Sequence, residues 1–146
     1  MPFSAGVLGY LGLIPFVGLT CLMLFRVDPG VEVSLLLSTY SAIILSFLGG
    51  IHWGIATENS LSKTLNSSKF NMHLILSVIP SLLGWAGLFA PEFAGFCIII
   101  FGFIFVLVID LRIAQMDFIP DWYPRLRKHL TLIVIGCLVI ASVLKF

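Results

Sequence analysis

Five long apolar runs, separated by short polar stretches, account for nearly all of this sequence. A bilayer core about 30 Å thick needs roughly 20 helical residues to cross it, and each run reaches that length. The runs are apolar all round, which favours helices over the short alternating strands of a transmembrane barrel. The pattern predicts an all-α membrane protein, a single domain over residues 1–146 with five transmembrane helices at about 6–25, 33–56, 70–90, 93–114 and 125–145.

Composition agrees with this class. Of the 146 residues, 60% are hydrophobic and 10% are charged, and the mean hydropathy is +1.14, as in integral membrane proteins. The net charge of +1 gives no reason to expect a nucleic-acid partner. Cys21, Cys97 and Cys137 fall within predicted spans without CxxC or Cys/His spacing, so we expect buried thiols and no metal site. No cofactor is indicated.

The distribution of basic residues predicts the orientation. With five spans, the N-terminus shares one side of the membrane with the second-to-third and fourth-to-fifth connections. The other side carries only Arg26 and Lys145. Because short cytoplasmic loops are enriched in Lys and Arg, we expect a cytoplasmic N-terminus and an external C-terminus. Six basic residues lie on the predicted cytoplasmic side: Lys63, Lys69, Arg112, Arg125, Arg127 and Lys128.

The main candidate for function is His52, an ionisable residue near the end of the second predicted span. Such a side chain is costly in lipid and normally faces protein or water. At 100° per residue it shares one helix face with Ser34, Ser38, Ser41, Leu45 and Gly49. The third span has a similar face of small and polar residues: His73, Ser77, Pro80, Gly84 and Gly87.

Asp110 lies at a similar depth near the end of the fourth span, on the face of Phe96, Phe103 and Val106. With His52, His73 and Arg112 it predicts a polar cluster in the cytoplasmic leaflet. An imidazole beside a carboxylate can relay protons or bind a metal, but it can equally be a structural pair, and we weigh the structural role above the catalytic one. Asp110 and Arg112 differ by 200° in azimuth, so we expect Asp110 to face inward and Arg112 to reach toward lipid phosphate.

Small and aromatic residues suggest further roles. Trp53, beside His52, could roof a pocket, although an interfacial anchor is the simpler interpretation. In the connection from Asp117, the side chains of Phe118, Trp122 and Tyr123 should lie at headgroup level. We expect Arg125, Arg127 and Lys128 to anchor anionic lipids there rather than clamp a ligand. The glycines expected in close helix packing are Gly9, Gly12, Gly49, Gly50 and Gly54.

Three blocks of the sequence resemble the transmembrane protein 69 family, which comprises uncharacterised bacterial inner-membrane and mitochondrial proteins. The resemblance extends to Asp110-Leu111-Arg112 and to Trp122-Tyr123 with Arg125 and Arg127. It implies fold and location but no activity. The stretch before the first span lacks the features of a cleaved signal and of an Arg-rich transit segment, so we expect a bacterial inner membrane, or the mitochondrial inner membrane for a eukaryotic chain. The blocks are Gly12-Leu13-Ile14-Pro15-Phe16, the run from Tyr40 to Gly54 (YSAIILSFLGGIHWG), and the run from Ser77 to Trp85 (SVIPSLLGW).

Two function classes are consistent with these observations. In the first, His52 and Asp110 line a cytoplasm-facing cavity that binds or conducts a small molecule, a proton or an ion. In the second, the protein is a non-catalytic assembly subunit that binds a membrane-protein partner or a second copy of itself, and its polar cluster is structural. An intramembrane enzyme ranks third, because the sequence has no metalloprotease motif, Gly-x-Ser-x-Gly elbow or paired-carboxylate signature.

Overall fold

The computed structural model describes residues 3–27, 29–61, 67–114, 120 and 122–145, with the backbone alone at 59–61, 67–70 and 114. Its described residues form helices without a strand, and five stretches are long and apolar enough to cross a membrane. Both findings confirm the predicted fold class. Lys63, Asp117 and Phe118, and the side chain of Lys69, lie outside the described part. The helices are α1 (Phe3–Leu11), α2 (Ile14–Leu24), α3 (Val33–Leu61), α4 (Ser67–Phe89), α5 (Glu92–Ala114) and α6 (Trp122–Leu144).

The first span consists of two helices rather than one. α1 ends at Leu11 and α2 begins at Ile14. Pro15 stands in the first turn of α2, where its missing N–H removes no helical hydrogen bond. The Gly12 carbonyl, left free at the break, accepts a hydrogen bond from the Tyr40 hydroxyl of α3 at 3.1 Å. The expected kink is therefore a complete interruption, stabilised by a neighbouring helix.

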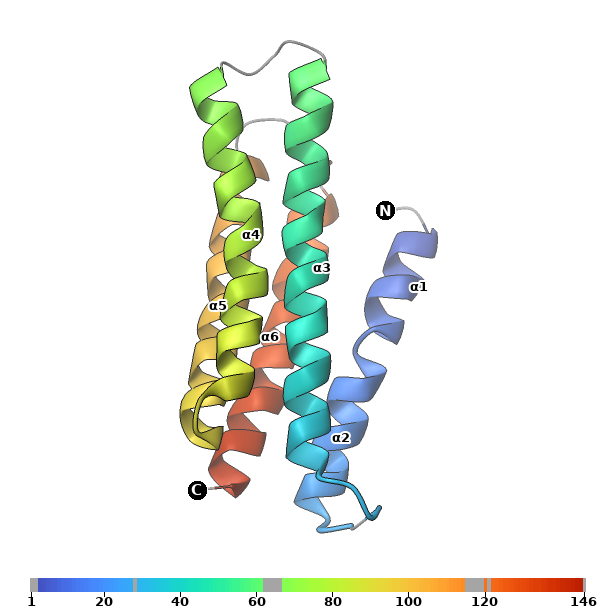
Figure 1. The fold of residues 1–146 in the computed structure, drawn as a ribbon. Helices are drawn as coiled ribbons and strands as arrows, with labels where there is room; N and C mark the ends of the chain where they lie inside the picture. The colour runs from blue at the N-terminus through green and yellow to red at the C-terminus, as the bar shows by residue number, and fades with distance from the viewer. Residues whose placement is uncertain (1–2, 28, 62–66, 115–119, 121, 146) are drawn as a thin grey trace.

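The long helices run side by side in alternating directions (Figure 1). One end of the bundle, here called the N-terminal end, carries the start of α1 and the connections between α3 and α4 and between α5 and α6. The opposite C-terminal end carries the end of α6. At the N-terminal end α1 leans away from the other helices, whereas α2 lies against the bundle.

The core is built from apolar side chains of α2, α3, α5 and α6. Phe16 lies at its centre and makes edge-to-face contacts with Tyr40 and Phe103, at ring-centroid distances of 5.1 and 6.0 Å. α3 and α4 approach closely, because a Cβ atom at Gly84 would lie 3.0 Å from the Cα of Ala42. The other fully buried apolar residues of the core cluster are Leu37, Leu45, Phe96, Ile99, Val106, Leu138 and Ala141.

Candidate functional site

Three ionisable side chains from three helices meet inside the N-terminal half of the bundle. Asp110 of α5 lies between His52 of α3 and Arg127 of α6. The Nε of Arg127 donates a hydrogen bond of 2.7 Å to Asp110 Oδ2. The Nε2 of His52 lies 3.2 Å from Asp110 Oδ1. The residues are 2%, 1% and 7% exposed for His52, Asp110 and Arg127, and they are called the buried cluster below.

Helix periodicity explains why two members point inward. On α5 the face of Phe96, Phe103 and Val106 is buried, and Asp110 follows one turn later on the same face. On α3, Ser41, Leu45, Gly49 and His52 are likewise buried. The structure thus brings His52 and Asp110 together, as the sequence predicted.

Arg127 was expected at the lipid headgroups, and the structure does not place it there. It begins a buried stripe on α6 at spacings of four and three residues, which continues through Thr131, Val134, Leu138 and Ala141. This stripe is the signal in the sequence that could have identified Arg127 as an inward-facing residue. Removed from lipid and water, a guanidinium needs an opposite charge, which Asp110 supplies.

The hydrogen bonding of the buried cluster is incomplete. The contact between His52 Nε2 and Asp110 Oδ1 is close, but its angle does not satisfy a hydrogen bond, and His52 Nδ1 has no partner. Arg127 Nη2 is also buried without a partner. The phenol of Tyr123, at the start of α6, interacts with Asp110 as well. A buried donor without an acceptor is costly, so the cluster retains hydrogen-bonding capacity that its own members do not use.

Other residues predicted for the cluster lie elsewhere. Arg112 is exposed on α5, in line with its azimuth, so Arg127 rather than Arg112 is the cation beside Asp110. His73 is half-buried on α4. Trp53 is 48% exposed and points away from the core, so it does not roof a pocket. Adjacent residues on a helix differ by 100°, which explains why Trp53 faces outward when His52 faces inward.

At the start of α6, the remaining predicted interfacial residues divide by helix face. Arg125 and Lys128 are exposed. Trp122 and Tyr123 are half-buried, and their rings meet edge to face at a centroid distance of 6.0 Å. Only Arg125 and Lys128 are fully available at the bundle surface for lipid phosphate.

The predicted packing glycines also divide. A Cβ atom at Gly49 would collide with the backbone carbonyl of Ser77 on α4, and one at Gly9 would lie 3.0 Å from Leu130 of α6. At Gly12 it would meet only the backbone of its own helix, and the role of this residue is at the helix break. Gly50 and Gly54 have nothing within 4 Å of a built Cβ and are exposed, so they do not pack against another helix. They lie on the outer face of α3.

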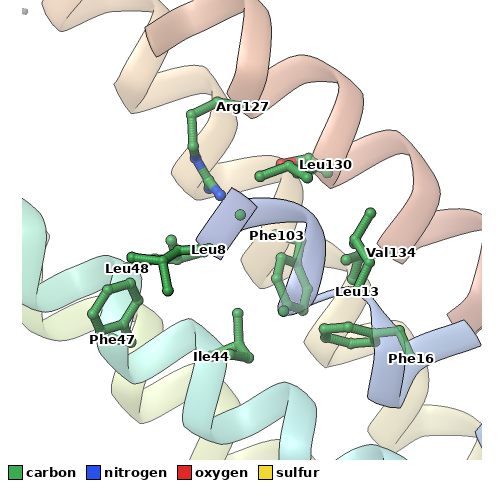
Figure 2. Close-up of a pocket in the computed structure, with 13 residues that line it drawn as sticks. Leu8, Leu13, Phe16, Ile44, Phe47, Leu48, Phe103, Arg127, Leu130 and Val134 are labelled. Carbon is green, nitrogen blue, oxygen red and sulfur yellow. The ribbon is translucent and has the colours of Figure 1, made fainter. Parts of the chain in front are cut away.

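A cavity of about 130 Å³ lies on the far side of Arg127 from Asp110. Arg127 and Thr131 of α6 contribute its polar lining, and most other lining residues are apolar (Figure 2). Neither His52 nor Asp110 lines this cavity. Among the described residues, no group of three or more His, Cys, Asp or Glu side chains could hold a metal ion.

A second ionic cluster, absent from the sequence-based predictions, lies at the C-terminal end. Lys145 Nζ lies 2.6 Å from Glu32 Oε1 and 3.3 Å from Glu92 Oε1, and the Ser34 hydroxyl donates to the same Glu32 oxygen at 2.9 Å. The ammonium group and the hydroxyl hold the pKa of Glu32 below its ordinary value, and the hydrogen bond to Glu32 raises the pKa of Lys145. Glu32, Glu92 and Lys145 are called the end cluster.

Comparison with known proteins supplies the family. Residues 1–143 match the model of the family described as "Protein of unknown function (DUF3429)". The chain is 37% identical over 141 residues to transmembrane protein 69 of Xenopus tropicalis, covering 94% of this chain and 53% of that protein. It is 29% identical over 141 residues to transmembrane protein 69 of Mus musculus, covering 92% and 53%.

The chain thus spans about half the length of the curated relatives it matches. No solved structure matches it. These findings confirm the resemblance inferred from the helix blocks. The chain belongs to the DUF3429 family, a family of membrane proteins of unknown function similar to transmembrane protein 69.

Proposed function

We propose that this protein is a non-catalytic membrane subunit in which the buried cluster fixes the packing of α3, α5 and α6. One observation carries this proposal: the single carboxylate of Asp110 contacts both His52 of α3 and Arg127 of α6, and all three residues are more than nine-tenths buried. A carboxylate in this position joins two other helices to its own. Removing one partner would leave an uncompensated charge inside the bundle, which disfavours any arrangement that separates the three helices.

The alternative is a cavity that conducts a proton or an ion past His52 and Asp110. Such a path needs polar groups free to face water. The hydroxyls of Ser38 and Ser41 instead donate to the backbone carbonyls of Ser34 and Leu37 on their own helix, each at 2.6 Å. The close contact of Gly49 with Ser77 closes the same face against α4. The packing of this face supports a helix interface rather than a conducting path.

The exposed basic residues at the N-terminal end support the proposed orientation and lipid contact. Arg125 and Lys128 of α6 and Arg112 of α5 are exposed there. They would bind anionic lipid phosphates with this end on the cytoplasmic side of a bacterial inner membrane, or on the corresponding side of the mitochondrial inner membrane. Exposed aromatic and basic side chains on the outer surface would bind the partner protein or a second copy.

Proton flux and protein abundance together test this proposal. In vesicles that contain the purified protein and a pH-sensitive dye, we expect no dissipation of a pH gradient beyond that of empty vesicles. In cells, we expect His52→Ala and Asp110→Ala to reduce the amount of folded protein, whereas Arg112→Ala, an exposed control in α5, leaves it unchanged. A flux that is lost in Asp110→Asn, or variants that remain abundant and folded while abolishing the phenotype of the deletion strain, would overturn the structural role.

A further inference from the structure

The cavity beside Arg127 has a mixed lining that suits a particular kind of molecule. It is enclosed by residues of α1, α2, α3, α5 and α6, and its walls include Phe16, Phe103 and Val134. Figure 2 shows the guanidinium of Arg127 extending from α6 toward the space between these apolar side chains. The cavity is separate from any path through His52 and Asp110, because neither residue lines it.

Two polar atoms in this lining have no hydrogen-bond partner. They are Nη2 of Arg127 and Oγ1 of Thr131, which belong to residues 7% and 1% exposed. The two residues are one turn apart on α6 and therefore lie on the same face. Buried donors left unpaired cost about 1–3 kcal/mol each. We propose that the cavity binds a neutral, carbonyl-bearing molecule with an apolar body, which enters from the bilayer and whose carbonyl oxygen accepts from Arg127 and Thr131.

The charge of the site selects a neutral ligand. The guanidinium of Arg127 is already matched by the carboxylate of Asp110 at 2.7 Å. An anionic ligand would bring an unmatched negative charge into an apolar environment, at a large cost. Nη2 can only donate, so the ligand must offer an acceptor, and the Thr131 hydroxyl can donate to the same oxygen. A carbonyl meets these requirements without adding charge.

The size and opening of the cavity constrain the rest of the ligand. A volume of about 130 Å³ is close to that of a cavity of about 150 Å³ known to hold benzene, so one ring or a short acyl segment fits. Leu8 of α1 and Phe47 of α3 also line the cavity, and they are 68% and 66% exposed. The cavity therefore opens on the outer, lipid-facing surface beside α1. A longer apolar tail would extend through this opening into the bilayer.

Thermal unfolding of the purified full chain in detergent tests the proposal with three probes. Decylubiquinone presents ring carbonyls, methyl oleate presents an ester carbonyl, and dodecane presents none. The informative variant is Thr131→Val, which removes a hydroxyl that has no partner in the free protein and should therefore preserve folding. Thr20→Val of α2 is the matched control, because its hydroxyl is also buried and unpartnered but does not line the cavity.

We expect at least one carbonyl probe to raise the unfolding temperature of the wild type in a saturable manner. Thr131→Val should weaken this binding about tenfold, as for the loss of one hydrogen bond, and Thr20→Val should bind as the wild type does. The more effective probe identifies the source of the carbonyl as a quinone or a lipid ester. No shift with either probe, an equal shift with dodecane, or undiminished binding in Thr131→Val would overturn the proposal.

Discussion

The same three helices are joined by charges twice, once inside the bundle and once at its C-terminal end. The buried cluster links α3, α5 and α6 through Asp110, and the end cluster links the start of α3, the start of α5 and the end of α6 through Lys145. Side chains of the buried cluster are at most 9% exposed, whereas those of Lys145, Glu92 and Glu32 are 32%, 43% and 59% exposed. The distances are similar, but the environments differ.

This difference determines what each cluster can do. Exposed pairs gain little because water and salt screen them. Inside an apolar bundle, an unpaired charge is so unfavourable that the pairing dictates which helix faces meet. The buried cluster should therefore control folding, and the end cluster should make only a small contribution to how the helix ends are held.

The largest expected effect comes from Arg127→Gln. It leaves the Asp110 carboxylate buried without its cation, and we expect a loss of about 3–5 kcal/mol of stability. Arg125→Gln, two residues away on the exposed face, is the matched control and should cost little. Unfolding of the purified variants in detergent measures both. Equal stability of the two variants would remove the distinction between buried and exposed charge.

A smaller loss is expected when the packing beside the buried cluster is disturbed. Gly49 lies one turn before His52, and its contact with Ser77 sets how closely α3 approaches α4. We expect Gly49→Ala to cost about 1–3 kcal/mol because the backbones must separate. Gly50→Ala, whose added methyl group meets nothing, should not destabilise the protein. The same unfolding assay decides, and a larger loss for Gly50→Ala would contradict the assigned interface.

Removal of the end-cluster cation should have a weaker effect that salt abolishes. We expect Lys145→Met to lower the unfolding temperature slightly at low ionic strength. At about 1 M salt, where the screening length falls to roughly 3 Å, it should match the wild type. Arg127→Gln should remain destabilised at both ionic strengths. A salt-sensitive defect in Arg127→Gln would show that solvent reaches the buried cluster.

The smallest expected effect is a dependence on acid pH. Because folding lowers the pKa of Glu32 from 4.5, the contribution of Glu32 is present above that value and is lost as pH falls through the lower folded pKa. Lys145 behaves in the opposite sense, and its contribution persists until pH rises through a folded pKa above 10.5. Glu32→Gln should flatten the acid limb of a stability profile. An acid limb as steep as in the wild type would argue against the pairing.

Hydropathy and helix periodicity were sufficient to predict the spans and the inward faces of His52 and Asp110, since lipid and core impose opposite preferences on a helix. Arg127 was assigned to the lipid surface because it lies among basic residues in the first turn of its helix, and the buried stripe behind it was not considered. Which glycine packs depends on where two helices cross, so Gly49 and Gly50 look alike in the sequence. The end cluster depends on three helix ends meeting in space, which no local pattern specifies.

A double-mutant cycle tests the structural role of the buried cluster most directly. The unfolding free energies of Asp110→Asn, Arg127→Gln and the double variant are compared with that of the wild type, and Glu32→Gln with Lys145→Met serves as the exposed reference cycle. We expect each buried single variant to be strongly destabilised and the double variant to lose less than the sum, with a coupling of about 1–3 kcal/mol, while the exposed cycle shows none at high salt. Additive losses in the buried cycle, or single variants as stable as the wild type, would contradict the claim that this ion pair holds the bundle together.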